Sequence, residues 1–432
     1  MSAPVFIAGT GIISAIGNNT AENLASLEQE KAGMGEMRFL NSIHRQRLPV
    51  AEVKHSNSEL AEMAEMPAHV SRTALLSAIA AKEALADAAI ENFHELRTGF
   101  ISANTVGGMD KTENFFPEFL SNHARGRLRS VVHHECGAVT EMVADKLAIK
   151  NYVSTISTAC SSSANSIFCG ARLIKQNILD VVIAGGTDAL AKFTLNGFNT
   201  LMILDNKYCQ PFDENRRGLN LGEGAGYVVL VSEKVAAKLA KKPACTLSGY
   251  CNANDAYHQT ASSPEGTGSF LAMKGAMQKS NIKPADISYI NLHGTGTQNN
   301  DIAEGTAIKL LFEKDFPPMS STKSFTGHTL GASGGVEAVF SVLSIQHGLI
   351  YPNLRFQTQM KELPFAPETK FSKGNQVNHV LSNSFGFGGN CSSLIFSKTW
   401  LALCLYDQPR AYHPRHHSVN YWLYRLPILR TG

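Results

Sequence analysis

The feature of this chain that most restricts its fold is a repeated alternation of short strand-like runs with longer helix-like stretches. Runs rich in Val and Ile are typical of buried strands, and the stretches between them place apolar residues at helical spacing. Such alternation predicts an α/β chain with a mainly parallel sheet covered by helices. We expect strands at 5–8, 100–103, 152–157, 181–184, 226–231, 244–250, 287–292, 380–383 and 392–396, and helices at 71–88, 161–176, 269–279, 301–312 and 331–347.

The alternation restarts after a lysine-rich link at 234–242, which suggests two similar halves. We therefore divide the chain into residues 1–240, residues 241–398 and a tail at 399–432. The tail holds both Trp, four of the eleven Tyr and the whole formal charge of +3, so it is a different kind of sequence. Because the tail has no clear helical or alternating period, we expect it to be dispensable for catalysis.

Charge and cysteine content exclude several classes of protein. No run of about 18 apolar residues is present, so a membrane span is not expected. Basic and acidic residues balance outside the tail, which argues against a nucleic-acid partner. Eight Cys without a C-x-x-C pair do not make a disulfide scaffold, and a reduced, cytoplasmic enzyme is the simplest account.

One segment of small residues, STACSSS at 157–163, places Cys160 between a strand and a helix. A helix N-terminus offers partial positive charge and unpaired N–H groups, an effect of about 0.3–1 kcal/mol that favours the thiolate. Cys160 is therefore a candidate nucleophile, although a base would still help it. The alternative for a Cys in this position is a buried residue at the start of a helix.

Three further segments place polar or glycine residues at the ends of strands or the starts of helices. They are NLHGTGT at 291–297 with His293, STKSFTGHTLGA at 321–332 with Lys323 and His328, and NSFGFGGN at 383–390. Taken alone, either His is more simply a structural hydrogen-bonding residue, and neither has the spacing of a Cys/His metal site. The glycines of the last segment allow backbone N–H groups to turn toward a ligand.

Taken together, and with PFDENRRG at 211–218 and LGEGAG at 221–226, these segments resemble the β-ketoacyl-[acyl-carrier-protein] synthases of the elongating type. The resemblance covers about residues 3–398. His328 completes a Cys-His-His set, whereas relatives primed by coenzyme A carry Cys-His-Asn and thiolases end with a second Cys. The resemblance implies the thiolase fold, a five-layer αβαβα sandwich of two similar halves, and usually a dimer.

The resemblance also implies roles for individual residues. Cys160 would take the acyl group, and the N–H groups of Cys160 and Phe387 would form the oxyanion hole. His293 and His328 would stabilise the enolate that forms when a malonyl thioester loses CO₂, with support from Lys323.

Other residues would bind or support the substrate and the catalytic groups. Three threonines resemble positions that bind the pantetheine arm: Thr260, Thr295 and Thr297. Three acidic residues resemble supporting positions: Glu337, Asp301 and Glu304.

The implied activity is a decarboxylative Claisen condensation of an acyl group on Cys160 with malonyl-acyl carrier protein, without a metal or a cofactor beyond the carrier's phosphopantetheine. The implied partners are acyl carrier protein and a second subunit, in a homodimer or in a heterodimer with a chain-length-factor paralogue. A non-catalytic chain-length-factor-like subunit is the alternative function, and Cys160 argues against it because those paralogues replace the nucleophile.

Two finer expectations concern pathway and docking. HGTGTQNND at 293–301 differs from the HGTST…GD form usual in housekeeping fatty-acid synthases, and is more similar to aryl-polyene and related polyketide-like ketosynthases. An acidic carrier protein needs a basic patch on its partner, for which the candidates are Lys111, Arg125, Arg127 and Arg129.

Overall fold

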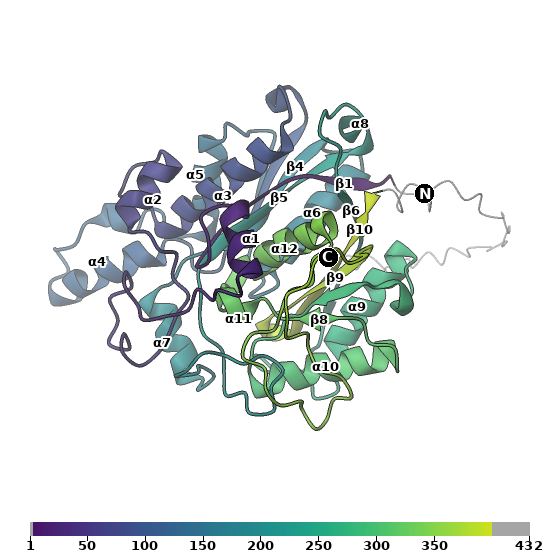
Figure 1. Cartoon of the computed structure of the whole chain (residues 1–432). Helices are drawn as coiled ribbons and strands as arrows, with labels where there is room; N and C mark the ends of the chain where they lie inside the picture. The colour runs from purple at the N-terminus through teal and green to yellow at the C-terminus, as the bar shows by residue number, and fades with distance from the viewer. Residues whose placement is uncertain (1–2, 400–432) are drawn as a thin grey trace, which may run out of the picture.

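The computed structural model describes residues 3–399, whose strands form a mixed ten-stranded sheet in the order β3-β2-β4-β5-β1-β6-β10-β9-β7-β8 (Figure 1). The first half contributes β1 (Val5–Ser14), β2 (Thr98–Ala103), β3 (Tyr152–Ile156), β4 (Val181–Asp188) and β5 (Gly224–Ser232). The second half contributes β6 (Cys245–Asn254), β7 (Tyr289–Asn291), β8 (Met319–Ser320), β9 (His379–Phe385) and β10 (Asn390–Lys398).

The two halves have the same strand order. From the outer edge inward, the first half runs β3-β2-β4-β5-β1 and the second runs β8-β7-β9-β10-β6, so each strand has a counterpart five strands later. The halves meet where β1 pairs with β6 over two residue pairs, Phe6 with Thr246 and Ile7 with Cys245. The expected similarity of the halves is therefore confirmed.

The direction of the strands differs from the prediction of a mainly parallel sheet. β2 pairs in parallel with β3 and β4, and β7 with β8 and β9, but the other pairings of the sheet are antiparallel. The reason lies in the connections. The chain leaves β4 and enters β5 at the same end of the sheet, so Asp188 pairs with Gly224 and β5 runs antiparallel to β4.

Helices form three layers around and between the two halves of the sheet (Figure 1). α6 and α12 contact strands of both halves and make the central layer. α3 and α5 cover the outer face of the first half, and α9 covers that of the second half with α10 packed on it. The bounds are α3 (Arg72–Ala88), α5 (Cys136–Lys146), α6 (Ser162–Lys175), α9 (Thr267–Ser280), α10 (Gln298–Phe312) and α12 (Ser333–His347). The five-layer αβαβα sandwich is confirmed.

The central strands are apolar along their whole length because both of their faces are buried. In β5, Tyr227, Val229 and Val231 pack in the core beneath α3, whereas Val228 and Leu230 point into the core around α6 and α12. A strand between two helix layers has no solvated face, and its sequence therefore shows a continuous apolar run.

Two glycines let the central layer approach the sheet closely. A Cβ added at Gly226 of β5 would lie 2.4 Å from the backbone nitrogen of Val336, and one at Gly335 would lie 2.3 Å from the Gly226 oxygen. Any side chain at either position would push α12 away from β5. The close approach fixes the first turn of α12, directly before Glu337.

The predicted helices are present with small shifts at their ends. Ser71 and Ser161 lie at the N-caps of α3 and α6, and α12 starts at Ser333 because 330–332 form a separate 3-10 turn. The remaining helices are α1 (Thr20–Glu28), α2 (Asn57–Ala64), α4 (Met109–Ser121), α7 (Lys192–Thr200), α8 (Glu233–Ala236) and α11 (Lys323–Thr326). No helix within 3–399 combines the length and apolarity that a membrane crossing requires. The prediction that the tail is dispensable concerns residues that, except for Thr399, lie outside the described part of the chain.

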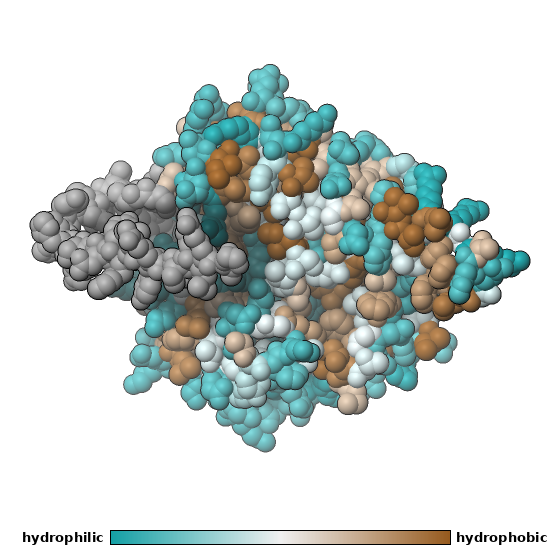
Figure 2. All heavy atoms as spheres, turned by 180° about the vertical axis from the view of Figure 1, so that it is seen from behind, coloured by the Kyte–Doolittle hydropathy of each residue, from teal (hydrophilic) through white to brown (hydrophobic). Residues whose placement is uncertain are grey.

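Exposed apolar side chains gather on α4 and the segment that follows it: Phe116, Leu120, Leu128 and Val132. Figure 2, which shows the molecule from behind, has apolar surface at the end opposite the grey atoms, where α4 lies.

Candidate active site

The four segments singled out in the sequence meet around one cavity of about 400 Å³. Each follows a strand: Cys160 lies after β3, His293 after β7, His328 after β8 and Phe387 after β9. All four residues line the cavity. Residues that are 227 positions apart in the chain are thus brought together by the stacking of the two halves.

Cys160 occupies a tight joint between β3 and α6. Ala159, directly before it, has φ of +52°, a backbone conformation that costs energy for a non-glycine residue. The Thr158 N–H donates to Ser162 Oγ at 2.8 Å and holds the turn closed. This turn directs the sulfur into the cavity, where only 6% of the residue is exposed.

Burial of Cys160 works against the stabilisation of the thiolate that the helix end provides. Burial raises the pKa of Cys160 to about 11, although the charge of Lys323 and hydrogen bonds from the N–H groups of Phe387 and Cys160 act in the opposite direction. Loss of hydration disfavours the anion more than these groups stabilise it.

The N–H groups of Cys160 and Phe387 are near enough to the Cys160 sulfur to lower the pKa of its thiol. Phe387 lies in a short 3-10 turn, Phe387–Gly389, that packs directly against the nucleophile joint. A Cβ at Gly386 would lie 3.1 Å from the Cys160 nitrogen, so the two segments are in close contact. The Phe387 ring stacks on Phe198 of α7 at a centroid distance of 5.7 Å.

His328 has a defined tautomer. Its Nδ1 accepts the Leu330 N–H at 3.0 Å and lies 3.1 Å from Ser333 Oγ. A nitrogen that accepts a backbone N–H cannot carry a proton, so the ring proton is on Nε2. Burial, followed by the charge of Lys323, lowers the pKa of His328 well below its usual value, and the ring is neutral.

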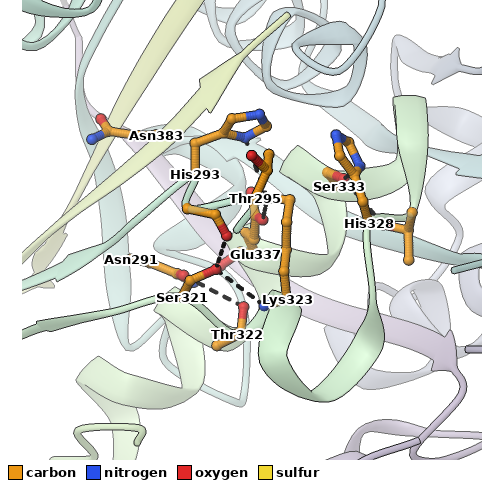
Figure 3. Close-up of polar contacts among 12 residues, drawn as sticks. Asn291, His293, Thr295, Ser321, Thr322, Lys323, His328, Ser333, Glu337 and Asn383 are labelled. Atoms are coloured by element: carbon orange, nitrogen blue, oxygen red, sulfur yellow. Dashed lines mark hydrogen bonds and ion pairs between the residues drawn. The ribbon is translucent and has the colours of Figure 1, made fainter. Parts of the chain in front are cut away.

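His293 has the same tautomer for a different reason. Its Nδ1 lies 3.3 Å from Lys323 Nζ, and an ammonium group can only donate. Burial and the nearby charges of Lys323 and His328 lower the pKa of His293 well below its usual value. The two imidazoles stand edge to face at 5.5 Å, and Figure 3 shows Lys323 beneath them and Ser333 beside His328.

Lys323 forms a buried ion pair with Glu337 of α12, and each side chain is only 2% exposed. Burial raises the pKa of Glu337 to about 7, and the charge of Lys323 opposes this increase. The pair thus holds a cation under His293 inside the protein. Neither group could remain charged there without the other.

Asp301 and Glu304, two of the predicted supporting residues, hold the turn that carries His293. Glu304 accepts the N–H groups of His293 and Gly294 at 2.9 and 2.8 Å, and burial raises its pKa to about 7. Asp301 accepts the Thr295 N–H at 3.0 Å. Both carboxyl groups therefore fix backbone positions and do not line the cavity.

The three threonines predicted to bind pantetheine all line the cavity, on the side of α10 and the loop before α9. Thr295 and Thr297 contact each other through their hydroxyl oxygens at 2.8 Å. Thr260 comes from the loop before α9, and its N–H donates to His258 Nδ1 at 3.1 Å. Together they supply hydroxyl groups along the approach to Cys160.

The side chains of Cys160, His293 and His328 also lie close enough to suggest a metal site, since their candidate ligand atoms are all within 4.8 Å of one another. The hydrogen bonds at Nδ1 argue against it. A metal-ligating His normally donates its other N–H to an acceptor. Here both Nδ1 atoms face donors, so each Nε2 keeps its proton and presents an N–H to the cavity.

One carboxylate of the site escaped the sequence analysis. Asp188, at the end of β4, accepts the N–H groups of Thr105 at 2.8 Å and Gly331 at 2.7 Å, and burial raises its pKa to about 6. Asp188 thereby anchors the turn that follows His328. A signal was present, because Asp188 ends an otherwise apolar strand with the sequence VVIAGGTD.

Comparison with known proteins agrees with this geometry. Residues 2–236 match the family model described as "Beta-ketoacyl synthase, N-terminal domain", and residues 244–357 match "Beta-ketoacyl synthase, C-terminal domain". The chain is 31% identical over 406 residues to 3-oxoacyl-[acyl-carrier-protein] synthase 2 of Staphylococcus aureus (strain COL), a match that covers 91% of this chain and 98% of that relative.

Two solved structures share the fold across nearly the whole chain. "The ishigamide ketosynthase/chain length factor" superposes with a TM-score of 0.86 at 25% identity and covers 92% of this chain and 100% of the matched chain. "Ketosynthase (ApeO) in Complex with its Chain Length Factor (ApeC) from Xenorhabdus doucetiae" gives a TM-score of 0.79 at 30% identity, covering 92% and 98% respectively.

Proposed function

The chain belongs to the beta-ketoacyl synthase family, and from this premise we propose that it condenses an acyl group with malonyl-acyl carrier protein to give 3-oxoacyl-acyl carrier protein and CO₂. The observation that carries the proposal is the cavity in which the Cys160 sulfur faces two neutral imidazoles, each with its proton on Nε2. A nucleophile beside two uncharged donors suits a reaction that first forms a thioester and then an enolate.

In the first step, the Cys160 sulfur attacks the carbonyl carbon of an acyl thioester on the carrier. The carrier's thiol leaves and takes the proton that Cys160 gives up, so no other acid or base is consumed. The N–H groups of Cys160 and Phe387 stabilise the oxyanion, and one such donor typically contributes about 10²–10³ in rate.

In the second step, a malonyl thioester occupies the same cavity and loses CO₂. The electron pair of the broken C–C bond forms an enolate, whose oxygen accepts the Nε2–H groups of His293 and His328. The enolate carbon attacks the carbonyl carbon of acyl-Cys160, the C–S bond breaks, and the sulfur takes up one proton. Lys323 keeps His293 in the donating tautomer.

The reaction as written needs no metal and no cofactor apart from the phosphopantetheine of the carrier. Thr260, Thr295 and Thr297 would receive the amide groups of that arm along the cavity wall. We also propose a cytoplasmic location, because the seven Cys within the described residues are free thiols.

We place the carrier protein over the basic surface beside the cavity. Arg217 lines the cavity and pairs with Asp205 at 2.6 Å, which also accepts the Lys207 N–H at 2.8 Å. Lys207 lines a second hollow, of about 520 Å³, with Arg45 and Arg47, and in it Arg45 pairs with Glu36 at 3.4 Å. An acidic carrier would find several exposed cations within reach of the cavity.

The basic residues expected from the sequence offer a second surface. Arg125, Arg127 and Arg129 are exposed after α4, but they do not line the cavity. Lys111 lies 3.8 Å from the carboxylate of Asp110. We therefore favour the surface around Arg217 and Lys207 for the carrier.

The apolar surface on α4 and its following segment is our proposed contact for a second subunit. The solved complex of ApeO with ApeC joins a ketosynthase to a chain-length factor. We propose that this chain likewise pairs with a second subunit of its family, either a copy of itself or a chain-length-factor paralogue. The segment HGTGTQNND at 293–301, which differs from the form usual in housekeeping fatty-acid synthases, favours an aryl-polyene or related polyketide-like pathway.

The alternative of a non-catalytic chain-length-factor-like subunit is not favoured, because Cys160, His293 and His328 all line the cavity. The deciding experiment supplies the purified chain with acyl- and malonyl-carrier protein and identifies the product by mass. Formation of 3-oxoacyl-carrier protein by the wild type but not by Cys160→Ser supports the proposal. Equal product from both proteins would refute it.

A further inference from the structure

Behind Cys160, outside the cavity, three Asn side chains from different elements form one hydrogen-bonded group, which we call the carboxamide cluster. It consists of Asn165 of α6, Asn252 of β6 and Asn390 at the start of β10. Asn252 Nδ2 donates to Asn390 Oδ1 at 2.7 Å, and Asn165 Nδ2 donates to the same oxygen at 2.9 Å. The cluster therefore joins the two halves of the protein.

The Oδ1 atom of Asn390 is the centre of this cluster. Besides the two amides, it lies 2.7 Å from Ser161 Oγ, whose hydroxyl is also 2.8 Å from the Thr158 carbonyl oxygen, so these two acceptors share the third donor. Within residues 3–399, the Nδ2 atom of Asn390 donates no hydrogen bond. The side chain thus acts through its oxygen as an acceptor, and that property can be tested.

Asn390 is connected to both segments that supply the oxyanion donors. Ser161 is the residue directly after Cys160, so the bond from its hydroxyl ties Asn390 to the nucleophile joint. The backbone oxygen of Asn390 accepts the Gly386 N–H at 2.9 Å and closes the loop that carries Phe387. One residue therefore bonds to the chain next to each N–H donor.

The loop around Phe387 needs such an anchor. Gly388 and Gly389 have positive φ values of +78° and +77°, and a segment with two successive glycines is intrinsically free to move. Two of its other backbone bonds, from Gly388 N–H to Gln259 at 2.7 Å and from Asp255 N–H to Gly389 at 2.8 Å, tie the loop to the segment 255–259. Asn390 supplies the bond to the Cys160 side.

We propose that Asn390 is a positioning residue that sets the spacing between the N–H groups of Cys160 and Phe387 by bonding both segments across the two halves. The inference rests on the proposed function, because an oxyanion hole matters only if a thioester is attacked. Oxyanion stabilisation depends on donors placed 2.7–3.1 Å from the position that the developing charge will occupy. Freeing one donor should therefore slow thioester attack and leave other reactions of the sulfur unaffected.

The test compares two variants of similar size. Asn390→Asp keeps an acceptor oxygen at the same position, whereas Asn390→Leu fills the space without one. For each protein we measure the rate at which acyl-carrier protein acylates Cys160 and the rate at which iodoacetamide alkylates it. Alkylation forms no oxyanion, so it does not depend on the oxyanion hole. Both rates depend equally on the fraction of Cys160 that is ionised, so the ratio of acylation to alkylation measures the oxyanion hole alone.

We expect the ratio for Asn390→Leu to fall at least about tenfold, since a misplaced donor loses part of the 10²–10³ that one donor contributes. The ratio for Asn390→Asp should stay within about threefold of the wild type. An unchanged ratio in Asn390→Leu, or an equal fall in both variants, would overturn the inference.

Two controls keep the outcome interpretable. Ser161→Ala removes only one of the three donors and should lower the ratio severalfold, so it serves if Asn390→Leu does not fold. A wild-type protein that iodoacetamide alkylates but acyl-carrier protein does not acylate would refute the proposed function itself. An unchanged ratio in variants of an active wild type refutes only the role of Asn390.

Discussion

Replacing Lys323 by Met tests both roles of the buried ion pair, which are to stabilise the fold and to keep His293 in its donating tautomer. The substitution leaves Glu337 without its cation at a position that is only 2% exposed. Removing one partner of a buried pair typically costs about 3–5 kcal/mol, and we expect a loss of that size in the free energy of unfolding. The substitution also removes the donor at His293 Nδ1, so decarboxylation of malonyl-carrier protein should fall at least about tenfold.

The stability loss should depend on pH with a defined sign. The Lys323 charge opposes the burial that raises the pKa of Glu337 to about 7, so Lys323→Met raises that pKa further. A carboxyl group whose pKa is raised in the folded state destabilises the protein as pH rises from the unfolded value toward the folded one. In the wild type, the loss of stability from this carboxyl group is complete near pH 7, whereas in Lys323→Met the stability continues to fall above pH 7. The difference between them should grow by up to about 1.4 kcal/mol per pH unit above pH 7.

The double variant Lys323→Met/Glu337→Gln distinguishes stability from catalysis. It has no buried charge to neutralise, so most of the lost stability and the extra pH dependence should return, while decarboxylation stays low. Urea titrations followed by far-UV circular dichroism at pH 6 to 9 give the stabilities, and CO₂ release gives the decarboxylation rate. Wild-type decarboxylation in the double variant would contradict the role assigned to Lys323, and a pH-independent loss in the single variant would contradict the role assigned to Glu337.

Three further predictions follow from the same geometry. Because the pKa of the Cys160 thiol is about 11, its alkylation by iodoacetamide should rise about tenfold per pH unit from pH 7 to 9.5, and a plateau near neutral pH would contradict this. His293→Ala and His328→Ala should each slow malonyl decarboxylation about 100-fold and acylation of Cys160 far less, as measured by CO₂ release and by mass; equal effects on both steps would contradict the enolate role. Charge reversal by Lys207→Glu with Arg217→Glu should raise the KM for acyl-carrier protein severalfold at low salt but not the KM for a free acyl-pantetheine, and an unchanged KM for the carrier would place docking elsewhere.

The sequence predicts the site better than it predicts the sheet. Cys160, His293 and His328 could be identified because their segments, taken together, resemble those of the β-ketoacyl synthases; the local pattern around each one alone is equally that of a structural residue. The parallel or antiparallel direction of strands could not be identified. The direction of a strand depends on the end of the sheet at which the preceding connection brings the chain back. The connection between β4 and β5 brings it back at the end where β4 finishes.

Interactions between distant residues and the degree of burial are not visible in the sequence. Asn390 and Ser161 are 229 positions apart, and neither stands out as a partner of the other until the two halves stack. The effect of burial on the pKa of Cys160 is hidden for a related reason. The helix end is a local feature, but the loss of hydration that outweighs it comes from both halves closing around the sulfur.

The central claim is that the same sulfur first accepts the acyl group and then gives it up to the enolate. The most direct measurement is a pulse and chase followed by intact mass and peptide mapping: acyl-carrier protein first, then malonyl-carrier protein. We predict one acyl group on Cys160 after the pulse, and its disappearance during the chase at the rate at which CO₂ and 3-oxoacyl-carrier protein appear. An acyl group on another residue, or one on Cys160 that persists while product accumulates, would contradict the account.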